Sequence, residues 1–581
     1  MDEAANNTTS KSAGAKPGTG IARISKVLEN LPVDIETVSD PVVRQAFIVL
    51  LNLVERVSAE NTALREEIQR LKDEINRLKG EQGKPGIKPN KKKDGDISSE
   101  KERKSREKSS GKTMRGAKLD KIKVHTTQVR RVDPKELPDD AVFKGYESVI
   151  VQELKITPEN TEFKKEVYYS PSQNKTYRAS LPAGYEGEFG PGIRSLVVSM
   201  KYVCNMSEPK ILEFLQEHDV LISAATISRM LTKNLEVFHQ EKADLYAAGL
   251  ESSTYQQVDD TSARVNGRNH YTQIVCNDLY TAYFTTERKD RLTILDVLRQ
   301  FESRTFLFND ETARLLEDLR VPQYLRKRLR EAPQGVLLTE EEMEALLCAL
   351  FPDPEKNLVY RIRIKEAGAI AAYHQETAIP VVKVLVCDDA PQFKLLTEEL
   401  LLCWVHEGRH YKRLRPVVPY HAERLETFRG RYWDFYAKLL VFKEDPCQKM
   451  LIALSEEFDD LFSTKTGYDD LDERIAKTKA KKEELLTVLR HPEAPPHNNG
   501  CENEARVAAR RRDVSLHTKT KEGTQACDTM TSIVRTAKKL GLSAFKYIRD
   551  RVSGAFRLPS LADLIRARTH HLNSANGCRG P

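Results

Sequence analysis

The stretch "TYQQVDDTSARVNGRNHYTQIVCNDLYTAYFTT", residues 254–286, contains three runs rich in β-branched and aromatic side chains. Two short breaks, "ARVNGRNH" and "DL", separate the runs, and this pattern is typical of consecutive antiparallel strands. The first run carries two adjacent acids, Asp259 and Asp260. The pattern predicts a central domain whose sheet begins with three antiparallel strands.

The segments that follow complete the outline of this domain. "DRLTILDVLRQF" (290–301) is predicted to be a helix, and "AIPVVKVLVCDDAPQF" (378–393) a buried parallel strand that ends at Asp388 and Asp389. We expect "KLLTEELLLC" (394–403) to be helical. This order is that of a ribonuclease-H-like α/β domain, in which an acid midway along the first strand lies beside an acid that ends the fourth.

Two carboxylates that meet at a buried sheet favour a Mg²⁺ site, because burial is costly for a carboxylate without a cation or a donor. For either acid pair alone, the simpler alternative is that one Asp caps the helix that follows. That alternative weakens when two acid pairs occupy matching places in one topology.

Residues 43–78 follow a heptad repeat. The a positions hold Phe47, Val54, Asn61, Ile68 and Ile75, and the d positions hold Val43, Leu50, Val57, Leu64, Leu71 and Leu78. Ile at a with Leu at d favours a parallel two-stranded coiled coil, and one Asn at a fixes its register. The alternative is a single amphipathic helix packed on the chain's own core. We expect a homodimer through residues 43–79.

The multidomain α/β organisation is drawn from shifts in composition and periodicity. We assign the N-terminal half to a disordered lead-in (1–40), the coiled coil (41–80), a flexible basic linker (81–123), a small β-rich module without zinc (124–190) and a helical, helix-turn-helix-like DNA-binding region (191–250). The ribonuclease-H-like domain takes 251–411, with an insertion at 303–375, and 491–555. Between its two parts lies an all-helical insertion (412–490), and 556–581 is a C-terminal tail.

The helix-turn-helix-like region places Ser223, Thr226 and Arg229 on its candidate recognition face, although short helix pairs are often only structural. The chain of 581 residues has a formal charge of +7, which indicates a polyanion partner only where the charge clusters. Nine scattered cysteines favour a reducing compartment, and no run approaches the roughly 18 apolar residues of a membrane helix. We expect a soluble, cytoplasmic protein without a membrane partner.

Four blocks of the sequence resemble the insertion-sequence-66 family of bacterial DDE transposases. They are "VDDTSARVNGRNHYTQIVCN" (258–277), "VLVCDDAPQF" (384–393), "CWVHEGRHYKRL" (403–414) and "HNNGCENEARVAARRRDVSLHTKTKEGTQACDTMTSIVRTAKKLG" (497–541). The resemblance extends from the coiled coil to about residue 552. The chain departs from the family pattern at His497 and Asn503, where the family has Asp and Arg, and it lacks the cysteines of the zinc module found in relatives.

The resemblance implies a set of site residues. Asp259, Asp388 and Glu502 match the three catalytic acids, with Asn498, Asn499, Cys403, Trp404 and His406 in the motifs around them. Glu502 and Glu504 are two residues apart, about 200° around a helix, so at most one can face the metals. Arg506, Arg510, Arg511 and Arg512 follow and are assigned to DNA, with Asn499 and His406 as supporting residues. Without the resemblance, a surface pair between Glu502 and Arg506 is the simpler interpretation.

The implied activity is a two-metal DNA strand cleavage and strand transfer with Mg²⁺, for which Mn²⁺ can substitute. The implied partners are double-stranded DNA, both transposon ends and target, and accessory proteins encoded by the element. The expected location is the nucleoid of a bacterium. The rival hypothesis is a catalytically silent or domesticated dimeric DNA-binding regulator, whereas a structural scaffold would leave the paired acids unexplained.

Overall fold

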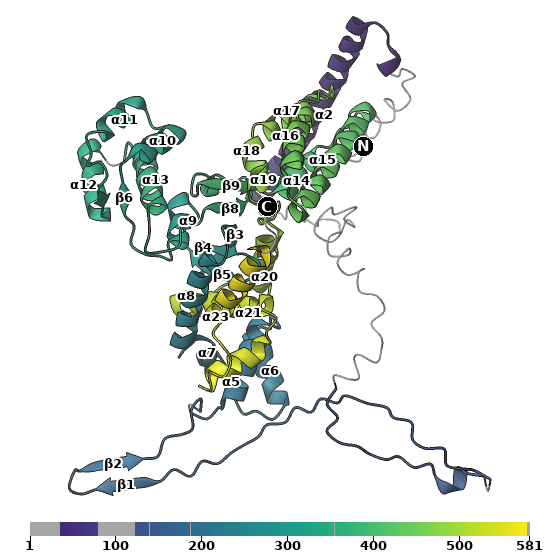
Figure 1. Ribbon diagram of the computed structural model, residues 1–581, viewed down its shortest axis with the longest axis vertical. Coiled ribbons are helices and arrows are strands. Elements are labelled where there is room, and N and C mark those ends of the chain that lie inside the picture. The colour runs from purple at the N-terminus through teal and green to yellow at the C-terminus, as the bar shows by residue number, and fades with distance from the viewer. Residues whose placement is uncertain (1–34, 80–121, 139, 186, 354, 578–581) are drawn as a thin grey trace, which may run out of the picture. The chain divides into compact units, whose positions relative to one another are not determined.

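The computed structural model describes residues 35–79, 122–138, 140–185, 187–353 and 355–577 (Figure 1). Most of the predicted lead-in and nearly all of the predicted basic linker lie outside these residues. The described chain forms two compact units. The larger takes residues from Met1–Lys88, Ala183–Met206 and Met230–Pro581, and the smaller from Pro89–Pro182 and Ser207–Arg229. Among the described helices, none has the length and apolar character to span a membrane.

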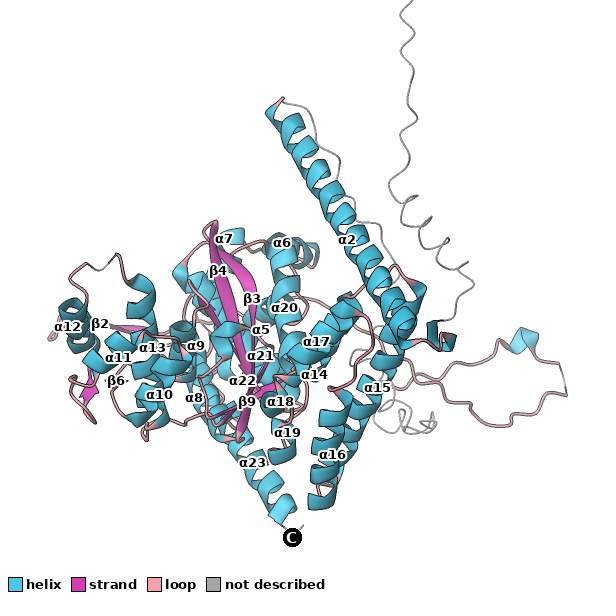
Figure 2. Cartoon of the chain, turned by 90° about the horizontal axis from the view of Figure 1, so that it is seen from above, coloured by secondary structure: helices cyan, strands magenta, loops and turns pink. Residues whose placement is uncertain are grey.

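The larger unit is built around a mixed five-stranded sheet with the order β5-β4-β3-β8-β9. The strands are β3 (Tyr255–Val265), β4 (Arg268–Cys276), β5 (Thr281–Thr286), β8 (Val384–Cys387) and β9 (Glu399–Leu402). The pairs β3–β4 and β4–β5 are antiparallel, which confirms the three predicted strands of 254–286. The pairs β3–β8 and β8–β9 are parallel, so the predicted buried strand is also confirmed. Figure 2 shows the sheet between helices.

One prediction in the sheet is wrong. Part of the segment 394–403 forms the parallel strand β9 after the short helix η3 (Pro391–Phe393), whereas we expected a helix. "ELLL" is too short for its period to separate a buried strand from a helix, and leucine favours helix only weakly. Pairing with β8 decides the conformation, because it satisfies backbone groups that would otherwise be buried without partners.

The outer edge of the sheet at β5 is covered by side chains of α21 (Lys521–Lys539). The backbone N–H groups of Thr281, Tyr283 and Thr285 donate to Thr536, Ser532 and Asp528, respectively, at 3.1, 3.0 and 2.6 Å. Alternate strand residues advance by about 6.8 Å and helix residues four apart by about 6 Å, so the two spacings match. Side chains of α21 thus accept hydrogen bonds from the backbone N–H groups at the outer edge of β5, where no further strand pairs.

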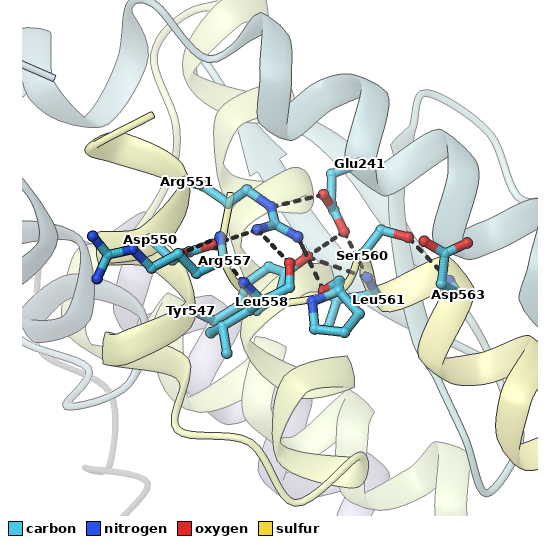
Figure 3. Close-up of polar contacts among 10 residues, drawn as sticks. Glu241, Tyr547, Asp550, Arg551, Arg557, Leu558, Ser560, Leu561 and Asp563 are labelled. Atoms are coloured by element: carbon cyan, nitrogen blue, oxygen red, sulfur yellow. Dashed lines mark hydrogen bonds and ion pairs between the residues drawn. The ribbon is translucent and has the colours of Figure 1, made fainter. Parts of the chain in front are cut away.

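The C-terminal segment 556–581, predicted to be a tail, instead contains a helix that packs on the larger unit. α23 (Leu561–Gly577) packs against α8 (Glu236–Glu251). Figure 3 shows the buried polar cluster at this junction: Glu241 accepts from the backbone N–H of Leu561 (2.8 Å) and from Arg551 (3.3 Å) of α22 (Ala544–Val552). Arg551 also donates to the carbonyl of Pro559 at 3.0 Å.

The two predicted insertions are largely helical. After α9 (Arg291–Leu298), the first contains β6 (Phe306–Leu307), α10 (Asp310–Asp318), α11 (Gln323–Leu329), β7 (Leu337–Leu338), α12 (Glu340–Leu350) and α13 (Leu358–His374). The second contains α15 (Pro419–Glu444), α16 (Gln448–Leu461), α17 (Asp469–Lys479), α18 (Lys482–Leu485) and α19 (Thr487–Arg490), and it follows α14 (Trp404–Arg413). Trp404 is fully buried against Tyr432, Phe435 and Phe458, so this aromatic core joins α14 to the second insertion.

The predicted coiled-coil segment is one continuous helix, α2 (Pro41–Leu78), whose first turn is capped by Asp40. One side of α2 packs on the helical insertion. The Asn52 amide donates to the carbonyl of Gly467 (2.9 Å), and Glu55 accepts from the backbone N–H groups of Val417 (2.6 Å) and Val418 (3.1 Å). Glu55 therefore satisfies donors at the start of α15, where the helix itself provides no acceptor.

The smaller unit contains a hairpin and a pair of helices. β1 (Val167–Ser170) and β2 (Lys175–Arg178) pair in the region 124–190 predicted to be β-rich, and its other described residues form no further strand. Most side chains there are exposed, so no face is buried that would stabilise a larger sheet. α6 (Glu208–Glu217) and α7 (Ala224–Thr232) form the predicted helix pair, and Ser223 caps the second. Arg229 is exposed and donates to Thr226 at 3.1 Å.

Candidate functional site

The register of the sheet brings Asp259 and Asp388 together. Gln257 of β3 lies opposite Val386 of β8 in a parallel pair. Asp259 and Asp388 are each two residues further on, and side chains two apart on a strand lie on the same face. The two carboxylates therefore lie side by side where β8 ends, as the sequence predicts, and each is partly buried.

The second acid of each pair is neutralised by the protein. Asp260 accepts from Lys289 (3.1 Å) and from Gln392 (2.9 Å). Asp389 forms ion pairs with Lys394 and with Lys481, both at 2.6 Å. In the described part of the chain, Asp259 and Asp388 have no such ion pair and accept only from the backbone N–H groups of Asp260 and Ala390. The structure thus separates the members of each acid pair by their counter-ions.

The third acid is carried by α20 (Asn499–Ser515), whose first turn is fastened to β3. Asn498 donates from its side chain to the carbonyl of Val258 at 2.7 Å, and the backbone N–H of Cys501 donates to the Gln257 side chain at 3.1 Å. A Cβ on Gly500 would collide with the same Gln257 amide, so only glycine allows this approach. These contacts place Glu502 over the strand that carries Asp259.

Glu502 and Glu504 have different surroundings, as their spacing predicts. Glu504 is 3% exposed and turns toward Tyr283 (2.8 Å) and Arg535 (2.6 and 2.7 Å). Glu502 is 8% exposed and lies 2.9 Å from Arg409, 3.5 Å from Arg506 and 3.3 Å from His406. Its Oε1 atom accepts no hydrogen bond from any described residue.

The three acids influence one another. The pKa of Asp259 is raised to about 7, mainly by burial and also by the negative charges of Asp388 and Glu502, against the opposing hydrogen bond from the backbone N–H of Asp260. A carboxylate that is hard to ionise without a cation fits a site for a hard divalent ion, whose charge reverses this effect. Three adjacent carboxylates, one with a buried oxygen that accepts no hydrogen bond from a described residue, are suitable ligands for Mg²⁺ or Mn²⁺.

A second group of possible ligands adjoins the acids. Cys403, His406 and Glu502 each place one donor atom within 4.8 Å of the others. Burial raises the pKa of Cys403 to about 11, so its thiol is protonated at neutral pH, and it accepts from the backbone N–H of Asn498 at 3.1 Å. Burial lowers the pKa of His406, which favours the neutral ring. These properties fit an uncharged wall beside Glu502 better than a thiolate metal site.

The arginines assigned to DNA divide into two groups. Arg506 and Arg510 are exposed, four and eight residues after Glu502 on α20. Arg511 instead turns inward, with its guanidinium 5.5 Å from the ring of Tyr202 and donating to Cys527. Arg512 donates to the backbone carbonyl of Ser262, so it braces α20 against β3.

Several residues around the acids were not singled out by sequence reasoning. Arg409, which contacts Glu502, is one of them. Of the two motif asparagines, Asn498 makes the side-chain hydrogen bond to β3. Arg409 follows His406 by three residues, which places both on one side of a helix, and this spacing was an available signal. Lys289 and Lys481 carried no such signal, because they lie far in sequence from the acids that they neutralise.

Comparisons with known proteins agree with this arrangement. Residues 355–526 match the family model described as the transposase IS66 family, a segment that includes Asp388 and Glu502. The chain is also similar to the uncharacterized protein y4jO of Sinorhizobium fredii (strain NBRC 101917 / NGR234). The two are 32% identical over 322 residues, which is 55% of this chain and 99% of that protein. This chain belongs to the IS66 family of transposases.

Proposed function

We propose that the protein is a DDE transposase that binds the ends of a mobile element and catalyses metal-dependent cleavage and transfer of DNA strands. The sheet, with three antiparallel strands followed by two parallel ones, is proposed to be a ribonuclease-H-like core. The observation that carries the proposal is the meeting of Asp259, Asp388 and Glu502. Among the described residues the two aspartates have no ion pair, whereas Asp260 and Asp389 beside them are neutralised by lysines.

In this proposal Asp259, Asp388 and Glu502 would together hold two Mg²⁺ or Mn²⁺ ions. When bound, the metal supplies Lewis acidity for an attack on phosphorus and for departure of the leaving oxygen. The chain's own residues set the geometry: β3 and β8 fix the two aspartates through backbone pairing, and Gln257 and Asn498 fix the first turn of α20. Rigid placement of this kind is what a phosphoryl-transfer site contributes.

The DNA strand is proposed to lie along the exposed side of α20. Arg506 and Arg510 follow Glu502 at helical spacings of four, so their guanidinium groups extend from the site along one side of the helix. Each can contact a backbone phosphate, which positions the strand without reading its sequence. Arg229 on α7 is proposed to contact DNA separately, and Arg511 is left out of this role because its guanidinium is turned inward.

The homodimer remains a proposal, and the two sides of α2 support it. The side that packs on the helical insertion carries Leu51, Asn52, Glu55 and Ser58, which are all buried and none of which is a predicted heptad core residue. Two predicted a positions, Phe47 and Val54, are half-buried against the docked core, whereas other heptad positions are uncovered: Leu50 is 55% exposed, Leu64 61% and Leu71 50%. A second copy of α2 can therefore pair along the heptads that follow Val54 while each helix stays attached to its own catalytic unit.

The test is strand cleavage and joining by the full chain with Mg²⁺ or Mn²⁺ on duplexes that carry the ends of the element. We expect Asp388→Ala to abolish both reactions, while Asp389→Ala, which removes an acid already paired with two lysines, retains most of the activity. Folding of both variants is checked by circular dichroism. Tight binding of the ends without cleavage under any metal condition would instead support the silent DNA-binding regulator.

A further inference from the structure

Arg409 forms an ion pair with Glu502, one of the carboxylates proposed to hold a metal ion. Its Nη2 atom donates to Glu502 Oε2 at 2.9 Å, and its Nη1 atom faces His406 Nε2 at 3.1 Å. Because a guanidinium is always a donor, the Nε2 atom of His406 must accept, which places the ring proton on Nδ1, 3.3 Å from Glu502 Oε1. Both oxygens of Glu502 thus face groups of α14.

A metal ion and Arg409 cannot share Glu502 without change. A ligand oxygen approaches Mg²⁺ or Mn²⁺ closely and gives its lone pair to the ion, whereas Arg409 now uses a lone pair of the same carboxylate. The two positive charges would also repel one another beside a carboxylate that is only 10% exposed. Binding of the ion therefore competes with the ion pair to Arg409.

The guanidinium of Arg409 has a route away from the acid. Its side chain is 33% exposed, compared with 10% for that of Glu502, so it can swing toward solvent while the carboxylate stays in place. The site proposed above would bring a DNA phosphate close to the metal ligands. A phosphate offers a released guanidinium the same paired acceptor geometry that Glu502 offers now.

We propose that Arg409 is a positioning residue that exchanges partners, holding Glu502 before the metal ion binds and a DNA phosphate afterwards. This inference rests on the proposed function. The exchange raises the affinity for each ligand when the other is bound, because the metal ion binds Glu502 and the DNA phosphate binds the released Arg409. Linkage requires the effect to be reciprocal.

The experiment measures Mn²⁺ binding to the full chain without DNA by isothermal titration calorimetry, followed by anisotropy of a labelled duplex of about 30 base pairs with and without Mn²⁺. We expect Arg409→Gln to bind Mn²⁺ about tenfold more tightly than the unmodified chain, since a hydrogen bond between charged groups that competed with the ion has been removed. The gain in DNA affinity that Mn²⁺ gives the unmodified chain should fall by about the same factor in this variant.

The double variant with Glu502→Gln provides the control. In that background, Arg409→Gln should leave Mn²⁺ binding unchanged, because the carboxylate for which the two cations compete is gone. Unchanged or weaker Mn²⁺ binding by Arg409→Gln alone would overturn the inference. Asp388→Asn distinguishes a failure of the partner exchange from a failure of the proposed function. If this variant binds Mn²⁺ as tightly as the unmodified chain, the proposed function itself fails. If it binds Mn²⁺ more weakly while Arg409→Gln has no effect, only the partner exchange fails.

Discussion

Asp259 lies midway along β3, partly buried and beside two further acids. Its pKa of about 7 describes a carboxyl group that binds a proton at mildly acidic pH. In the unfolded chain the same group ionises near pH 4, so between about pH 4 and pH 7 the folded state binds more protons. The stability of the metal-free protein therefore decreases as the pH rises through this window.

This protonation leads to a prediction for metal binding. Below about pH 7 a proton competes with the ion for Asp259, so Mn²⁺ affinity should fall by up to about tenfold per pH unit and should be level above pH 7. Asp259→Asn should lose this dependence and should stabilise the metal-free protein at about pH 8 by about 1–3 kcal/mol. Calorimetric titrations and thermal unfolding between about pH 6 and pH 8 measure both effects. An affinity that is independent of pH in the unmodified chain would contradict the prediction.

Glu502 and Glu504 allow a matched comparison on one helix. Glu504→Gln removes the partner of Arg535 in a buried pair, so we expect a loss of about 3 kcal/mol in the free energy of unfolding. Glu502→Gln should change that free energy by less than about 1 kcal/mol but reduce strand cleavage about a hundredfold or more. Urea unfolding and a cleavage assay on the same preparations test the pair. The assignment of Glu502 is wrong if the two variants lose cleavage only in proportion to stability.

At the scale of elements, α2 has two sides with different tasks. The docked side carries Glu55, and the exposed side carries later heptad positions, including Leu64 and Leu71. Leu64→Asp combined with Leu71→Asp should convert a dimer into a monomer, because two charges would enter an apolar seam. Glu55→Gln should leave the dimer intact. Light scattering coupled to gel filtration measures the mass, and a dimer that persists with both aspartates would exclude this seam.

The elements also show what local sequence encodes. The three antiparallel strands and β8 were predicted because their apolar pattern and breaks are local properties of 254–286 and 378–393. β9 and α23 were not, because pairing with β8 fixes the first, and the cluster of Glu241 and Arg551, far apart in sequence, anchors the second. Local periodicity contains no information on contacts of this kind.

The candidate site was partly predictable for the same reason. The resemblance identified Asp259, Asp388 and Glu502, and the structure adds how the two aspartates differ from their neighbours: Lys289 and Lys481 neutralise Asp260 and Asp389 from distant segments. The role proposed for Arg409 likewise depends on distances that only the folded chain provides.

At the scale of the whole molecule, DNA binding should depend on salt through the exposed cations of α20. Arg506→Ala and Arg510→Ala should each reduce the slope of log affinity against log salt by about one, because each removes one phosphate contact. Arg566→Ala, an exposed arginine of α23, serves as the control and should leave the slope unchanged. Anisotropy titrations over a range of salt concentrations provide the slopes. Equal slopes for all three variants would place the DNA elsewhere.

The order of the acids along the chain also has a consequence for synthesis. Glu502 is translated about 240 residues after Asp259 and only after the whole helical insertion, which takes roughly 10–50 s at bacterial rates. A nascent or prematurely terminated chain therefore has α2 and two aspartates but neither Glu502 nor α21, which covers the edge of β5. In the proposed dimer, such a fragment would pair with a full-length copy and leave one complete set of acids, so truncated products would act as inhibitors of the intact protein.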